Sequence, residues 1–169
     1  MRLGKFLHIV GLCLFVGSIG GHILFSGLAD ELTDLTEVAV LRTGLDLSVR
    51  YLTLPGIGLL WLSGLYMVLK HRRMLRANWL RVKIAVSVLV TINGIFILTP
   101  IVGKLARLAK QAVGDGGFSA EYWTFRVYED IAGTINLAMV LLVVVMACYK
   151  PTLKFFKRRI LKSDSPAAQ

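Results

Sequence analysis

Four long apolar segments constrain the fold of this chain more than any other feature. They cover residues 3–28, 51–69, 79–102 and 131–149. About 20 apolar residues in a helix are enough to cross the hydrocarbon core of a bilayer. Hydrophobic residues make up 56% of the 169 residues, which is more apolar surface than a soluble domain of this size can bury. The sequence therefore predicts an all-α integral membrane protein, one domain of four helices that run up and down as a bundle.

The stretches around these segments predict further helical structure. Residues 29–51 have helix-compatible apolar spacing, so we expect a short amphipathic helix there or an extension of the neighbouring segments. Pro55 and Pro100 interrupt the second and third segments. A kink at each proline is tolerated in lipid where neighbouring groups satisfy the freed carbonyl.

Lys and Arg are concentrated in residues 70–83 and in the tail 150–169, whereas residues 29–51 are mainly acidic. Membrane-protein connections rich in Lys and Arg stay on the cytoplasmic side. We therefore expect both termini and the basic tail in the cytoplasm, with the protein in a bacterial inner membrane. The net charge of +10 fits side chains at helix ends that meet anionic lipid headgroups. No nucleic-acid-binding motif accompanies it, so the expected surroundings are lipid and not nucleic acid.

Two of the three histidines, His8 and His22, lie within the first apolar segment. On a helix, fourteen positions leave the two side chains about 40° apart around the axis and roughly 21 Å apart along it. Both histidines therefore face nearly the same side. Gly11 and Ser18 lie between them on that side. With Gly4 they form a stripe of small residues that allows another helix or a flat ligand to approach closely.

This spacing resembles that of membrane cytochromes b, in which one helix offers a ligand to a haem in each leaflet. Neutral imidazole is a good iron ligand. The sequence therefore predicts His8 and His22 as metal ligands of haem b, with one haem at His8 or two if His22 also binds iron. The alternative is that each histidine hydrogen-bonds a neighbouring helix or lies at the membrane interface without metal.

The chain offers few further ligands for these haems. Beside His8 the candidates are His71, Lys83 and Met146. His71 belongs to a basic connection and is expected in solvent or among headgroups, and Met146 is a candidate gap-filler of the bundle. Lys83 lies about one turn inside the third segment, where it either extends its amine to the headgroups or contacts a haem propionate or the iron. Near His22 there is no second histidine. An iron there would be five-coordinate, use another ligand type or bind His22 of a second copy across a two-fold axis; otherwise the site is empty.

Other polar residues of the apolar segments have structural explanations. Asn93 and Asn136 are expected to form hydrogen bonds between helices. Arg126, Glu129 and Asp130 open the last helix, where a local ion-pair cluster with favourable N-terminal acids accounts for them.

Four sequence stretches together suggest a family. They are KFLHIVG, LTLPGIGLLWLSGLYM, WLRVKIAVSVLV and the closing FRVYED with LLVVVMACYKP. Their order resembles that of HemJ-type protoporphyrinogen IX oxidases, and the related CopD-like integral membrane proteins are similar to the chain as well. The resemblance implies a four-helix membrane fold and a b-haem tied to His8 and Lys83. Three features depart from that pattern: Ile92-Asn93 replaces Tyr-His, residues 129–132 replace Asn-Glu-x-Pro, and His22 lies elsewhere than the second histidine of the family's first helix.

These departures favour haem binding over porphyrinogen oxidation. The preferred hypothesis is thus a b-type haem protein that transfers electrons, within a homo-oligomer or a larger membrane redox complex, or toward quinone. Two alternatives stay open: a HemJ-like protoporphyrinogen IX oxidase, and a haem-free structural subunit that packs against partners. No Gly-rich nucleotide loop is present, so a flavin or nicotinamide donor would belong to a partner.

Overall fold

The computed structural model describes residues 2–71 and 77–149, and within them it contains helices and no strand. The elements are α1 (Arg2–Glu31), α2 (Leu35–Ser48), the π-helix η1 (Val49–Thr53), α3 (Leu54–Lys70), α4 (Asn78–Ile92), the π-helix η3 (Asn93–Leu98), α5 (Thr99–Asp115) and α6 (Ala120–Tyr149). The basic tail expected at 150–169 lies outside the described residues. The all-α prediction is confirmed.

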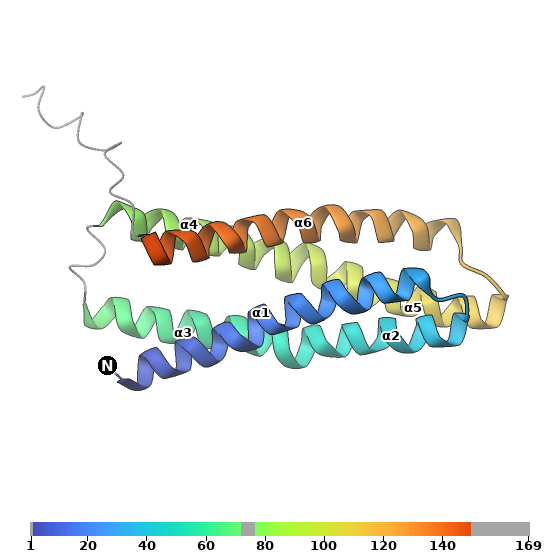
Figure 1. The fold of residues 1–169 in the computed structure, drawn as a ribbon, viewed down its shortest axis with the longest axis horizontal. Helices are drawn as coiled ribbons and strands as arrows, with labels where there is room; N and C mark the ends of the chain where they lie inside the picture. Colours follow the sequence, from blue (N-terminus) through green and yellow to red (C-terminus); the bar gives the residue numbers. More distant parts are fainter. Residues whose placement is uncertain (1, 72–76, 150–169) are drawn as a thin grey trace, which may run out of the picture.

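The elements combine into four long rods that run along one axis (Figure 1). Each rod is long and apolar enough to cross a membrane: Leu3–Glu31, Leu35–Lys70, Asn78–Asp115 and Ala120–Tyr149. Large apolar side chains lie on their outer surfaces; Leu24 is 73% exposed, Leu62 70% and Phe96 72%. Lipid is the solvent that makes such exposure favourable, and the predicted membrane-type four-helix bundle is confirmed.

Residues 29–51 extend the second segment, as one of the two sequence alternatives anticipated. α2 begins after Asp34, whose carboxylate caps the helix by accepting hydrogen bonds from the backbone N–H groups of Thr36 at 2.6 Å and Glu37 at 3.4 Å. The helix then continues through η1 into α3. The second rod therefore starts well before residue 51, where the apolar segment begins.

Both π-helices precede a proline. Pro55 follows η1 and Pro100 follows η3. Proline lacks a backbone N–H and clashes with the carbonyl four residues earlier, so the backbone widens before it. The Leu54 N–H then bonds the carbonyl of Val49, five residues earlier. The expected disturbances at the prolines are local widenings of continuous helices.

α1 packs tightly along α3 through glycine. A Cβ at Gly56 would lie 3.0 Å from the backbone nitrogen of Phe15, and a Cβ at Gly11 would lie 3.0 Å from that of Leu60. Only glycine permits this approach. Ser18, in the same stripe of α1, hydrogen-bonds Thr53 Oγ1 at 2.9 Å. A helix, and not a flat ligand, therefore covers the small-residue stripe between the two histidines.

The bundle has two distinct ends (Figure 1). At one, here called the proximal end, α1 begins, α3 ends, α4 begins and α6 ends. At the other, the distal end, lie the turns 32–34 and 116–119, and Gly116 ends α5 with a left-handed φ of 75°. His8 lies toward the proximal end of α1, and His22 toward its distal end.

Candidate functional sites at the two ends of the bundle

The first candidate site is built around His8 at the proximal end. The half-buried His8 ring of α1 faces α3, and its Nδ1 lies 3.0 Å from Ser63 Oγ. The Ser63 hydroxyl itself donates to the carbonyl of Leu59 at 2.5 Å. Because that hydroxyl hydrogen is engaged, the oxygen accepts a hydrogen bond from His8 Nδ1–H, and the network assigns the lone pair of the ring to Nε2.

Two further residues define the surroundings of the His8 ring. Lys83 of α4 is the charged side chain that acts electrostatically on it. Gly64 of α3 lies against the ring: a Cβ there would be 3.8 Å from His8 Cε1, an ordinary van der Waals distance. The structure thus gathers an oriented imidazole and a cation at the proximal end.

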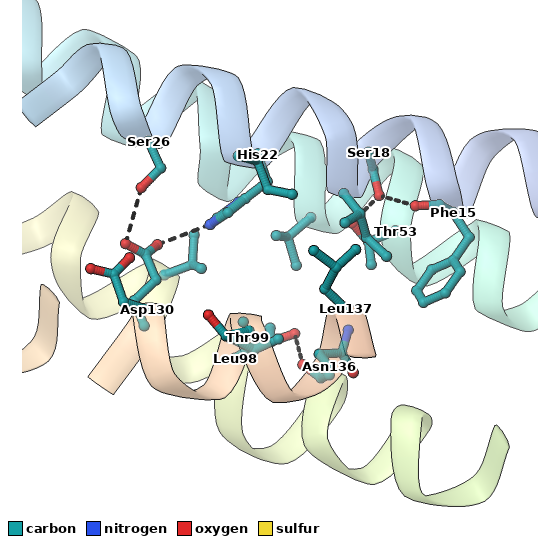
Figure 2. Close-up of a pocket in the computed structure, with 18 of the residues that line it drawn as sticks. Phe15, Ser18, His22, Ser26, Thr53, Leu98, Thr99, Asp130, Asn136 and Leu137 are labelled. Carbon is teal, nitrogen blue, oxygen red and sulfur yellow. Dashed lines mark hydrogen bonds and ion pairs between the residues drawn. The ribbon is translucent and has the colours of Figure 1, made fainter. Parts of the chain in front are cut away.

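The second candidate site is a polar network toward the distal end, here called the distal network. Its members are His22, Ser26, Asp30, Arg42, Tyr122, Arg126, Glu129 and Asp130. The Glu129 carboxylate is its centre and is buried. Figure 2 shows interactions from the His22 and Ser26 side chains that converge on it, at 3.0 Å and 3.3 Å.

Two guanidinium groups complete the network. Arg42 of α2 is 1% exposed and donates to Glu129 Oε2 at 2.8 Å and to the Tyr122 hydroxyl at 3.2 Å. Arg126 of α6 pairs with Glu129 at 3.3 Å and with Asp30 and Asp130. Charges this deep in a bundle are stable only when they are paired and hydrogen-bonded, and these are.

The formal charge of the distal network depends on His22. Three carboxylates face two guanidinium groups, so the network carries one negative charge when His22 is neutral and none when the ring is protonated. The distal network has no spare positive charge in either state. It is therefore poorly suited to bind an anion.

A cavity of about 400 Å³ adjoins the distal network (Figure 2). α1 lines it with Phe15, Ser18 and His22, and α6 lines it with Glu129 and Asn136. Residues of both π-helices also form its wall. Small-molecule sites in proteins have volumes in the same range, about 300–1,000 Å³.

Residues 2–151 match the sequence profile of a family described as predicted integral membrane proteins, DUF2269. The chain belongs to this DUF2269 family. No curated protein and no solved structure matches it. The family description agrees with the four apolar rods, and the DUF2269 chain is an integral membrane protein.

The structure divides the four predicted site residues of the DUF2269 protein between the two ends of the bundle. His8 and Lys83 share the proximal end, as the resemblance implies. His71 is exposed at the end of α3. His22 belongs to the distal network, where its Nε2 forms a hydrogen bond with Glu129 of α6. This contact is the alternative predicted for His22, a hydrogen bond to a neighbouring helix. Metal binding at His8 and His22 stays a prediction.

Several partners were not identified from the sequence. The burial of Arg42 was not predicted, although Val38, Ala39 and Leu45 place apolar residues on the same helical face and so signal it. The ion pairs of Arg126 with Glu129 and Asp130 are confirmed and extend to α1 and α2, but these residues do not open α6, which begins at Ala120. In residues 2–71 and 77–149, no three His, Cys, Asp or Glu side chains lie close enough together to hold a metal ion.

The two intramembrane asparagines differ from each other. Asn93 forms the expected interhelical hydrogen bond, from its amide to the carbonyl of Ala132 at 3.0 Å. Asn136 is equally buried, but its Oδ1 accepts no hydrogen bond from any described residue. The prediction of interhelical bonding is therefore confirmed for Asn93 and wrong for Oδ1 of Asn136.

Proposed function

We propose that this DUF2269 protein is an integral membrane b-type haem protein that transfers electrons, with His8 as the iron ligand. The observation that carries the proposal is the bond from His8 Nδ1–H to Ser63 Oγ at 3.0 Å. Imidazoles that bind metals commonly donate their second N–H to such a partner, which fixes the ring and its tautomer. Nε2 of His8 would then carry the lone pair that binds iron.

The rest of the proximal end fits the same group. The ammonium of Lys83 supplies a positive charge that suits a haem propionate. Haem supplies reversible one-electron chemistry when it is bound. In this chain Ser63 orients the ligand, Lys83 balances charge and the apolar rods exclude water.

A single haem at His8 is the simplest form of the proposal. A second haem at His22 would have to use Nδ1, because Nε2 already bonds Glu129 at 3.0 Å. Electrons would pass from the haem toward a lipid-soluble quinone or to a partner within a larger membrane redox complex, which includes a homo-oligomer. The cytoplasmic location of the proximal end, in a bacterial inner membrane, belongs to the same proposal.

A HemJ-like protoporphyrinogen IX oxidase is the second candidate, favoured by the proximity of His8 and Lys83. The other family positions are occupied differently: Asn93 bonds the carbonyl of Ala132, and Glu129 is the centre of the distal network. A deletion strain that still makes haem at the normal rate would eliminate this candidate. Accumulated porphyrinogen in a strain carrying His8→Ala would support it.

The optical spectrum of the purified protein tests the haem proposal. Wild type is expected to show a Soret band and a reduced α band, and His8→Ala to lose both. His71→Ala is the matched control, because it removes an exposed histidine at the same end of the bundle and leaves the spectrum unchanged. A folded wild type without either band, or equal bands in the His8→Ala protein, would favour the third candidate, a haem-free structural subunit.

A further inference from the structure

The cavity beside the distal network is a separate site from the one proposed around His8. It lies between α1 and α6, and Figure 2 shows Ser18 and His22 on one side and Asn136 and Leu137 on the other. Phe15, Ile19 and Leu137 give it apolar walls. Such a cavity suits a molecule with an apolar body.

Both helix disturbances of the bundle meet at this cavity. Val49 and Thr53 of η1 and Gly94 and Leu98 of η3 all line it. π-helical turns widen a helix locally and occur frequently at functional sites. One lies in the second rod and one in the third, each is followed by a proline, and both shape the cavity wall.

Asn136 supplies the most specific clue to an occupant. It is 5% exposed, lines the cavity, and its Oδ1 has no hydrogen-bond partner among the described residues. A buried acceptor without a donor is costly, and native proteins rarely retain one without a reason. The Thr53 hydroxyl does not donate a hydrogen bond to Asn136 Oδ1, because it is paired with Ser18 Oγ at 2.9 Å. A ligand with an O–H or N–H donor would satisfy Oδ1.

The charges around the cavity restrict the ligand further. Arg126, the cation of the cavity wall, already pairs with Asp30, Glu129 and Asp130. A carboxylate or phosphate would find no unpaired cation among the described lining residues. It would also meet the negative charge of Glu129. These charges disfavour an anion, and the apolar walls of the cavity favour an uncharged molecule over a cation.

We infer that this cavity binds an uncharged, lipid-soluble ring that carries hydroxyl groups, the chemical class of the hydroquinones. One hydroxyl donates to Asn136 Oδ1, and the apolar side chains enclose the ring. The choice of hydroquinones among hydroxylated lipophiles rests on the proposed function, because a membrane haem exchanges electrons with carriers that dissolve in lipid. Binding itself does not depend on the haem at the proximal end.

Calorimetric titration of the purified full chain in detergent with duroquinol tests the inference. Wild type is expected to bind duroquinol saturably. Asn136→Leu removes the acceptor at nearly constant side-chain volume, and its affinity is expected to fall by about tenfold, the usual effect of one lost hydrogen bond. Asn93→Leu is the matched control: it removes a buried asparagine outside the cavity lining and retains wild-type affinity.

The dimethyl ether of duroquinol provides a test that needs no variant. It keeps the ring but cannot donate a hydrogen bond, so wild type should bind it at least about tenfold more weakly than duroquinol. Equal affinity for the ether, equal affinity of Asn136→Leu, or mere partition into micelles would each overturn the inference. A preparation with a Soret band and no saturable binding contradicts this inference alone, whereas saturable binding without a Soret band contradicts only the haem proposal.

Discussion

Nε2 of His22 lies 3.0 Å from Oε1 of Glu129, a contact between residues 107 positions apart in the sequence. It connects α1 to α6, two rods whose backbones otherwise lie on either side of the cavity. Arg42 brings α2 to the same carboxylate at 2.8 Å. The distal network therefore fixes the relative positions of three helices through one buried group.

The first prediction concerns the energetic role of Arg42. Arg42→Met removes one partner of a buried ion pair and leaves the Glu129 charge undercompensated, which should cost about 3–5 kcal/mol of stability. Arg50→Met is the control, because its pair with Asp46 lies on an exposed surface and contributes at most about 1 kcal/mol. Melting temperatures in detergent measure both. Equal melting temperatures for the two variants would show that the distal network is not stabilising.

The second prediction concerns the contact between α1 and α3. Gly56→Ala places a Cβ 3.0 Å from the backbone nitrogen of Phe15, so the helices must separate, at a cost of about 1–3 kcal/mol. Gly58→Ala introduces the same methyl group two residues away, where no atom lies within 4 Å, and should not lower the melting temperature. Thermal unfolding in detergent compares the pair. The close packing would be refuted by a Gly56→Ala protein as stable as Gly58→Ala.

The third prediction uses the stability of the two asparagine variants. Asn136→Leu removes an acceptor that has no partner, so the ligand-free protein should gain about 1 kcal/mol. Asn93→Leu loses the bond to the Ala132 carbonyl and should lose stability by a similar amount. Opposite shifts in melting temperature are therefore expected. Shifts of the same sign would mean that Asn136 has a partner within the folded chain.

The fourth prediction tests how His8 is oriented. Ser63→Ala removes the acceptor of His8 Nδ1–H, and loss of such a partner typically weakens metal binding by about 10–100-fold. Titration of the apoprotein with haemin measures the affinity. Ser87→Ala removes the same hydroxyl from α4, outside the His8–Ser63 pair, and should bind haemin as wild type does. Unchanged affinity in Ser63→Ala would separate Ser63 from the ligand role of His8.

The fold was largely predictable from the sequence because hydropathy and helix length are local properties. The four rods follow from the apolar segments, and the two prolines mark the π-helices before Pro55 and Pro100. The full length of the second rod was harder to predict. Acidic residues in 29–51 indicate a connection, whereas the helical phase of Val38 and Leu45 indicates a buried face, and packing favoured the helix.

The candidate sites were only partly predictable, because they depend on which rods are neighbours. His8 and Lys83 were identified as polar residues in apolar surroundings, and that signal is local. The partner of His22 could not be identified in the same way: Glu129 looked like a favourable acid near a helix start, and its pairing with α1 requires the tertiary arrangement. The cavity depends on four rods at once and has no sequence signature.

The central claim is that His8 binds the iron of a b-type haem, and pyridine haemochrome analysis of the purified protein tests it most directly. The assay identifies haem b and counts haems per chain, independently of the axial ligands in the native state. We predict one haem b per wild-type chain and none in the His8→Ala protein, with both proteins folded. A folded, fully membrane-inserted wild type that contains no haem would contradict the account.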